Sequence, residues 1–163
     1  MSFSLIPRGV YPAVTHISPK ALAEKSVRLV LADLDNTLVP YGVTEPPEEI
    51  VAWKQALEAQ GIQLFLLSNS RRPGRAQGFA QRLGIPYQGH SGKPRRAGYL
   101  RAMERMGVTP DQTVMVGDQI FTDVWGANRA GIYTMLTQPV DKSTDEIQIV
   151  IKRWFEGPFR KER

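Results

Sequence analysis

The sequence has no cysteine and only two histidines, His16 and His90. Without cysteine, the chain has no disulfides, no thiolate metal ligands and no cysteine nucleophile. Two histidines also argue against a zinc site built from several histidines. A metal site in this chain would therefore be built from oxygen ligands.

Long hydrophobic runs are absent as well. Every apolar stretch is too short to span a bilayer, and residues 1–20 lack the charged start and apolar centre of a signal peptide. The 163 residues are 42% hydrophobic and 23% charged, which is typical of one ordinary folded domain. We therefore expect a single core in a cytoplasmic protein.

Short apolar runs alternate with helix-like stretches along the middle of the chain. Buried strands are predicted at residues 27–32, 62–67, 85–87, 113–116 and 132–136. Helices are predicted at residues 46–60, 73–83, 95–106 and 122–130. This alternation predicts an α/β fold with a single, doubly wound, Rossmann-like parallel sheet, whose ligand site lies at the carboxyl ends of the strands.

We expect three segments: an N-terminal arm at residues 1–26, a core at residues 27–151 and a basic-aromatic tail at residues 152–163. The arm is expected to pack on the core and to contain a short helix near residues 19–25. In the helix at 95–106, Ala97, Leu100 and Met103 are expected to form the buried face. Near the C-terminus, Ile147, Ile151 and Trp154 fit one face of a helix.

The net charge of +5 is unevenly distributed. Residues 71–105 hold nine basic side chains against one acidic side chain, Glu104. Such clustering favours an anionic partner, such as a phosphorylated substrate, an anionic membrane or a nucleic acid. The alternative is that these arginines coat the solvated faces of helices.

Polar side chains follow four of the five predicted strands. Asp33 and Asp35 follow the first, Ser68 and Asn69 the second, Lys93 the third, and Asp118 and Asp123 the fourth. Carboxylates that converge on one spot repel one another unless a cation lies among them, and oxygen ligands favour Mg²⁺. A lysine and a hydroxyl would hold phosphate oxygens. The set predicts phosphoryl transfer, in which the protein positions groups and neutralises charge. For Asp33 alone, the alternative is an acid in a strand-end turn.

The ordered set resembles the haloacid dehalogenase (HAD) superfamily of phosphatases. The segment DLDNTL at 33–38 matches its DxDxT motif, Ser68 matches the second motif, Lys93 the third, and Gly117-Asp118 with Asp123 the fourth. The segments LLSNS, GKP and GDQIFTDVWGANRAG are similar to the YqeG-type branch, subclass IIIA, which is related to phosphatidylglycerophosphate phosphatases.

The resemblance implies roles for the reacting groups. Asp33 would be the nucleophile that forms an aspartyl-phosphate. Asp35 would donate a proton to the leaving oxygen and then activate water. Ser68, Asn69 and Lys93 would bind the phosphoryl group.

The resemblance also implies a Mg²⁺ site. Asp33, the backbone carbonyl of Asp35 and Asp118 would hold the ion. Asp123 would support the site through water or by orienting Lys93, and Thr37 would be a further supporting residue.

The spacing leaves no room for an inserted cap domain. Asp33 and Ser68 are 35 positions apart, and Ser68 and Lys93 are 25 apart, distances that a loop, one helix and one strand already fill. The loop between Thr37 and Pro46 is the only local candidate for a lid. An open site suits a substrate that supplies its own cover, such as a lipid head group, a protein or a nucleic-acid end.

Two classes of phosphorylated substrate remain open. The first is a phosphate monoester on an anionic lipid, of the phosphatidylglycerophosphate kind. It is favoured by the resemblance, by the open site and by the tail, whose cationic and aromatic side chains suit peripheral contact with an anionic membrane. The alternative for the tail, slightly favoured, is that Trp154 and Phe155 pack on the domain. The second class is a soluble phosphoester or a phosphoprotein.

A function of a different class is binding without catalysis, for instance as an RNA-associated module that uses the basic residues. The acids at positions 33, 35, 118 and 123 would repel RNA, and the sequence has no aromatic-rich RNA-binding motif. We therefore expect no nucleic-acid partner. The sequence does not predict an oligomeric state.

Overall fold

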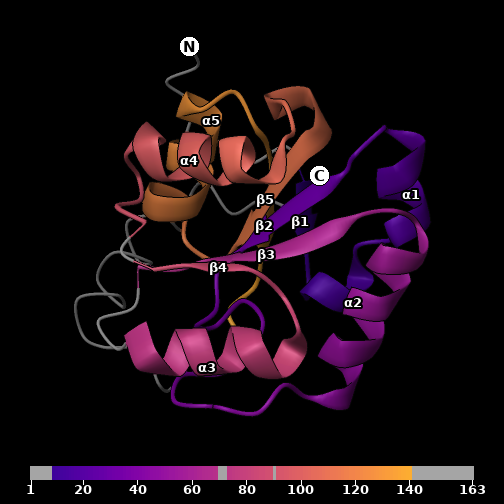
Figure 1. The fold of residues 1–163 in the computed structure, drawn as a ribbon, viewed down its shortest axis with the longest axis vertical. Helices are drawn as coiled ribbons and strands as arrows, with labels where there is room; N and C mark the ends of the chain where they lie inside the picture. Colours follow the sequence, from indigo (N-terminus) through magenta and orange to yellow (C-terminus); the bar gives the residue numbers. More distant parts are fainter. Residues whose placement is uncertain (1–8, 70–72, 90, 141–163) are drawn as a thin grey trace.

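The computed structural model describes residues 9–69, 73–89 and 91–140 (Figure 1). The strands are β1 (Gly9–Tyr11), β2 (Leu29–Ala32), β3 (Gln63–Leu67), β4 (Tyr87–Gln88), β5 (Thr113–Gly117) and β6 (Tyr133–Thr137). The α-helices are α1 (Pro19–Glu24), α2 (Glu48–Ala59), α3 (Pro73–Leu83), α4 (Arg96–Met106) and α5 (Trp125–Arg129). Short 3₁₀ turns lie at Val14–His16 and Pro110–Gln112, and a π-helical turn lies at Ile120–Val124.

The strands form one parallel sheet in the order β1-β6-β5-β2-β3-β4. The predicted α/β fold with a single parallel sheet is therefore confirmed. From β2 the chain moves outward through β3 to β4, and then returns to the other side of β2 to form β5. Doubly wound sheets bind their ligands where the direction of winding reverses, at the carboxyl ends of the strands. Asp33 and Asp118 directly follow the two strands that meet at this point.

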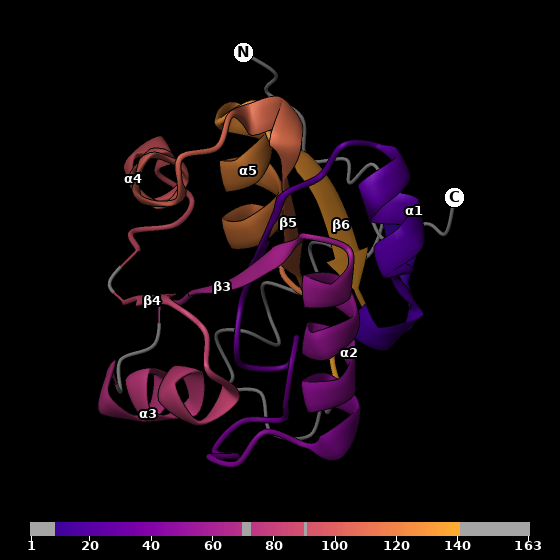
Figure 2. The ribbon, with the colours of Figure 1, turned by 45° about the vertical axis from the view of Figure 1, so that its right-hand side comes forward.

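Helices cover both faces of the sheet (Figure 2). Val30 and Ala32 of β2 belong to the core beneath α1, α2 and α3, whereas Leu29 and Leu31 belong to the core beneath α4 and α5. Successive side chains of a strand point to opposite faces, so a strand covered on both faces must be apolar at every position. This requirement explains the continuous apolar run in the sequence.

The buried face of α4 agrees with the prediction at Met103 and differs at the other two positions. Tyr99, Ala102 and Met103 pack against the sheet, whereas Leu100 is 42% exposed and Ala97 is also exposed. Both sets of residues have helical spacing, and the helix buries the one that includes its aromatic residue. Gly107, in the left-handed conformation with φ 67°, ends the helix.

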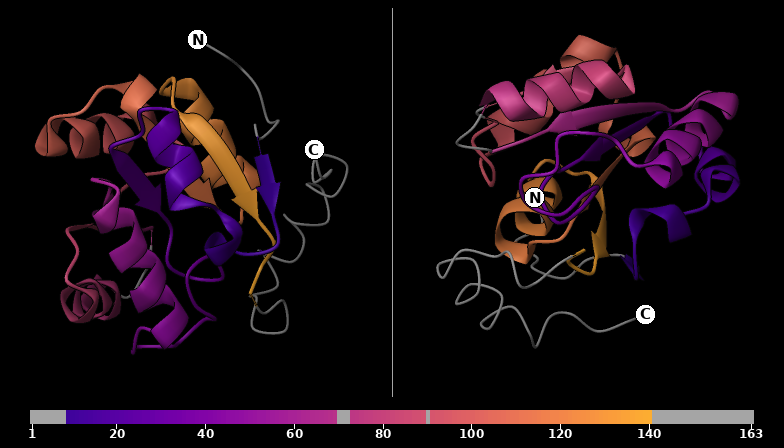
Figure 3. Two further views of the ribbon diagram at one scale, coloured as in Figure 1. Left: turned by 90° about the vertical axis from the view of Figure 1, so that its right-hand side faces the viewer. Right: turned by 90° about the horizontal axis from the view of Figure 1, so that it is seen from below.

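The N-terminal segment contributes a strand that the sequence analysis did not predict. β1 pairs in parallel with β6, beside which it lies at the edge of the sheet (Figure 3). The short helix expected near residues 19–25 is present as α1. The division into arm, core and tail stays a prediction. The tail and the helical face of Ile147, Ile151 and Trp154 lie outside the described residues.

The described residues contain no cap domain. Between β2 and β3 the chain forms a loop and α2, and between β3 and β4 its described part forms α3. Within the same residues, no helix is long and apolar enough to cross a membrane.

Candidate active site

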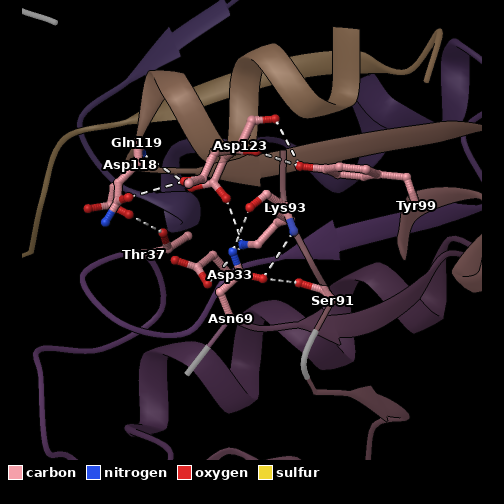
Figure 4. Close-up of polar contacts among 10 residues, drawn as sticks. Asp33, Thr37, Asn69, Ser91, Lys93, Tyr99, Asp118, Gln119 and Asp123 are labelled. Carbon is pink, nitrogen blue, oxygen red and sulfur yellow. Dashed lines mark hydrogen bonds and ion pairs between the residues drawn. The ribbon is translucent and has the colours of Figure 1, made fainter. Parts of the chain in front are cut away.

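The carboxyl end of β2 carries Asp33, followed by a tight turn. The Asn36 N–H donates to the Val39 carbonyl at 2.7 Å, and Asn36 adopts a left-handed φ of 59°. Asparagine tolerates this conformation better than most residues. The turn directs Thr37 toward the end of β5, where its hydroxyl donates to Asp118 Oδ1 at 3.2 Å (Figure 4). This bond links the ends of the two central strands.

Asp123 reaches the same place through the π-helical turn after β5. A π turn holds one more residue than a turn of α-helix, and such turns are frequent at functional sites. The Gln119 N–H donates to Asp123 Oδ2 at 3.2 Å, and the buried Tyr99 hydroxyl donates to the Thr122 carbonyl at 2.7 Å. A Cβ at position 117 would lie 2.2 Å from Asp123 Oδ2, so this approach requires Gly117.

Lys93 joins two of the carboxylates. Its Nζ donates to Asp123 Oδ1 at 2.7 Å and to Asp33 Oδ1 at 3.1 Å. The side chain is 2% exposed, so the ammonium group lies among the carboxylates with little access to water. The predicted convergence of these three residues is present in the structure.

The loop that carries Lys93 is held by Asn69, which follows β3. Asn69 Oδ1 accepts hydrogen bonds from the Ser91 hydroxyl at 2.5 Å and from the Lys93 N–H at 3.1 Å. Its Nδ2 donates to the Lys93 carbonyl at 2.9 Å. Ser68 is buried beside it, and its carbonyl accepts from the Ser91 N–H at 3.2 Å. Asn69 thus has a positioning role that the sequence analysis missed, while its role in binding phosphate stays a prediction.

The electrostatics of the site follow from its burial. Burial raises the pKa of Asp33 from 3.8 to about 6, Lys93 opposes this change, and the negative charges of Asp123 and Asp35 add to it. Burial lowers the pKa of Lys93, but the ion pairs with Asp123 and Asp33 outweigh it, so the pKa is above its usual range. Lys93 therefore stays charged, whereas the ionised form of Asp33 is destabilised.

The carboxylates fit a divalent cation. Asp33, Asp118 and Asp123 each offer an oxygen within 4.8 Å of the other two. Lys93 offsets one of their three negative charges. Hard oxygen donors with residual negative charge are the ligands that Mg²⁺ prefers. The Asp35 side chain is not among these three, and the contribution of its backbone carbonyl stays a prediction.

Asp35 instead pairs with Arg75 of α3. Arg75 Nη1 lies 2.5 Å from Asp35 Oδ1, and the two side chains are 10% and 15% exposed. The sequence analysis counted Arg75 only among the basic residues of 71–105. The DxD pattern gives no sign of a partner 40 positions away.

Residues 41–131 match the sequence model of the haloacid dehalogenase-like hydrolases. The match covers more than half of the chain and includes Lys93, Asp118 and Asp123. The chain belongs to this hydrolase family. The resemblance predicted from the motifs is thereby confirmed.

Two relatives connect this haloacid dehalogenase-like hydrolase with named proteins. The probable phosphatase YqeG of Bacillus subtilis (strain 168) is 35% identical over 138 residues, which cover 85% of this chain and 80% of that protein. The chloroplastic phosphatidylglycerophosphate phosphatase 1 of Chlamydomonas reinhardtii is 30% identical over 159 residues, which cover 93% of this chain but 59% of that protein. The predicted similarity to the YqeG-type branch is confirmed by these matches.

A solved structure shares the fold. The 3-deoxy-D-manno-octulosonate 8-phosphate phosphatase of Moraxella catarrhalis, in complex with magnesium ion, phosphate ion and KDO, matches with a TM-score of 0.53 at 15% identity. The match covers 78% of this chain and 79% of that protein. The likeness extends over most of both chains and confirms the HAD-like fold.

Proposed function

We propose that this haloacid dehalogenase-like hydrolase is a Mg²⁺-dependent phosphomonoesterase that acts through an aspartyl-phosphate on Asp33. The observation that carries the proposal is the meeting of Asp33, Asp118 and Asp123 with Lys93 at the carboxyl edge of the sheet. A phosphate dianion needs positive charge at this place. Lys93 supplies part of it, and Mg²⁺ held by Asp33, Asp118 and the Asp35 carbonyl would supply the rest.

The residues of the chain divide the reaction between them. An Asp33 oxygen attacks phosphorus while the bond to the leaving oxygen breaks, and Asp35 gives that oxygen a proton. A water molecule then gives a proton to Asp35 and attacks phosphorus, the bond to Asp33 breaks, and phosphate leaves. Ser68 and Lys93 hold the phosphoryl oxygens in both steps. With a pKa of about 6, Asp33 is mostly ionised at neutral pH, as a nucleophile must be.

For the substrate we favour a phosphate monoester on an anionic lipid. The Chlamydomonas relative is named a phosphatidylglycerophosphate phosphatase, and the described residues place no cap over the site. The chain would then meet the membrane surface from the cytoplasm, and the tail at 152–163 would contribute to that contact. The alternative is a soluble phosphoester or a phosphoprotein, which an open site also admits.

The test compares three substrates with the full chain: phosphatidylglycerophosphate in mixed micelles, glycerol phosphate and a phosphoserine peptide. We expect turnover with Mg²⁺, loss of turnover in chelator and recovery when Mg²⁺ is restored, with the lipid hydrolysed fastest. Full turnover in chelator, or turnover with Zn²⁺ alone, would overturn the assignment of the metal. Faster hydrolysis of either soluble substrate would select the alternative.

A further inference from the structure

We propose that Arg75 is a positioning residue for catalysis, which holds Asp35 where it can exchange a proton with the leaving oxygen. The inference rests on the proposed function and adds a residue that lies outside the four motifs. Arg75 belongs to α3, whereas the motif residues lie at or after the carboxyl ends of strands. Its contribution therefore comes from the flank of the site.

The Arg75 guanidinium joins Asp35 to the loop that follows it. Nη1 pairs with Asp35 Oδ1 at 2.5 Å. Nε and Nη2 donate to the Val43 carbonyl at 3.0 and 2.8 Å, and Nη2 also lies 3.4 Å from the Pro40 carbonyl. Three nitrogens of one planar group thus hold a carboxylate and the backbone of residues 40–43. Because both charged side chains are at most 15% exposed, water competes little for these bonds.

This arrangement answers a geometric need of Asp35. A general acid is effective only when it lies within hydrogen-bonding reach of the oxygen that it protonates. Asp35 lies on a turn beyond the end of β2, where the sheet no longer fixes its direction. The two bonds to the Val43 carbonyl fix the guanidinium plane, and Nη1 in turn fixes the Asp35 carboxylate. A lysine would supply the charge without the planar fork.

Arg82 provides a matched control on the same helix. Its Nε pairs with Glu45 Oε1 at 3.0 Å, and its Nη1 lies 3.4 Å from the Thr44 carbonyl. It therefore contacts the same loop, through Glu45 and Thr44 rather than through Asp35. The Arg82 side chain is 48% exposed, and exposed ion pairs contribute little to stability. Arg82→Ala removes a loop contact and leaves the pair of Arg75 with Asp35.

The experiment measures release of the leaving group in a single turnover with Mg²⁺. Nitrophenolate leaves from nitrophenyl phosphate without a proton, whereas the alkoxide that leaves from glycerol phosphate needs one. We expect Arg75→Ala to slow release of the leaving group by about 10-fold to 100-fold with the glycerol ester and by less than about 3-fold with the nitrophenyl ester. Arg75→Lys should recover part of the loss, because its ammonium group can still donate a hydrogen bond to Asp35. Arg82→Ala should match wild type on both esters.

A second comparison uses Asp35→Asn as the background. In the Asp35→Asn background, Arg75→Ala should not slow release of the leaving group from the glycerol ester any further, because both residues act through one proton donor. Equal losses on the two esters, or losses that multiply in the double variant, would overturn the inference and leave the proposed function intact. If the wild type turns over neither ester, both the proposed function and this inference are overturned. If Arg75→Ala does not fold, Arg75→Lys carries the same comparison between the esters.

Discussion

Replacing Asp33 with asparagine is expected to stabilise the metal-free protein. Burial raises the pKa of Asp33 from 3.8 to about 6 against the attraction of Lys93, so ionised Asp33 costs the folded state free energy. At about 1.36 kcal/mol for each pH unit between the two values, this cost is about 3 kcal/mol at neutral pH. Asparagine has no charge to desolvate, so Asp33→Asn should raise the free energy of unfolding by up to about this amount.

The effect should depend on pH in a defined direction. Below about pH 3, Asp33 is protonated in both the folded and the unfolded chain, and the two proteins should be about equally stable. As the pH rises toward 6, the unfolded chain loses its proton first, so the wild type loses stability relative to Asp33→Asn. The difference should be about 1 to 2 kcal/mol at pH 5 and about 3 kcal/mol at pH 7.

Urea unfolding in chelator at pH 5 and pH 7, followed by circular dichroism, measures both values. Glu104→Gln, which removes an exposed carboxylate of α4, is the control and should match the wild type. Adding Mg²⁺ should stabilise the wild type more than Asp33→Asn, because a ligand that binds only the native state raises its stability. If Asp33→Asn is less stable than the wild type in chelator at pH 7, or if the difference in stability does not change with pH, burial does not dominate the pKa of Asp33.

Two further substitutions test how Asp123 and Lys93 are positioned. Gly117→Ala places a Cβ 2.2 Å from Asp123 Oδ2, so turnover of nitrophenyl phosphate should fall by about 100-fold or more. Gly74→Ala is the control: a Cβ at position 74 meets open space, so this variant should not lower turnover. Asn69→Ala removes three hydrogen bonds from the loop that carries Lys93, so kcat measured in the steady state should fall by about 10-fold. Unchanged kinetics would contradict the positioning role of Asn69.

The central part of the fold was predictable because its strands are buried on both faces. β2 has no exposed position, so its apolar run is continuous and easily recognised in the sequence. Asp33, Ser68 and Asp118 directly follow such strands, and parallel strands bring their carboxyl ends to one edge. The sequence order of Asp33, Ser68, Lys93 and Asp118 therefore predicted their arrangement around the site.

Other features depend on tertiary contacts that leave no local pattern. β1 has three residues at the sheet edge, which is too short for a periodicity. The buried face of α4 is chosen by the packing of Tyr99 beneath the π-helical turn, and not by apolar content alone. Arg75 resembles its basic neighbours in the sequence, and only the folded chain brings it to Asp35.

The most direct test of the mechanism is to identify the residue that carries the phosphoryl group during turnover. Wild type mixed with nitrophenyl phosphate and Mg²⁺ is quenched in acid, digested and analysed by mass spectrometry. We predict a phosphoryl group on Asp33, more abundant in Asp35→Asn because water is activated more slowly, and absent in Asp33→Asn and in chelator. A phosphoryl group on another residue, or turnover by Asp33→Asn at the wild-type rate, would contradict the mechanism.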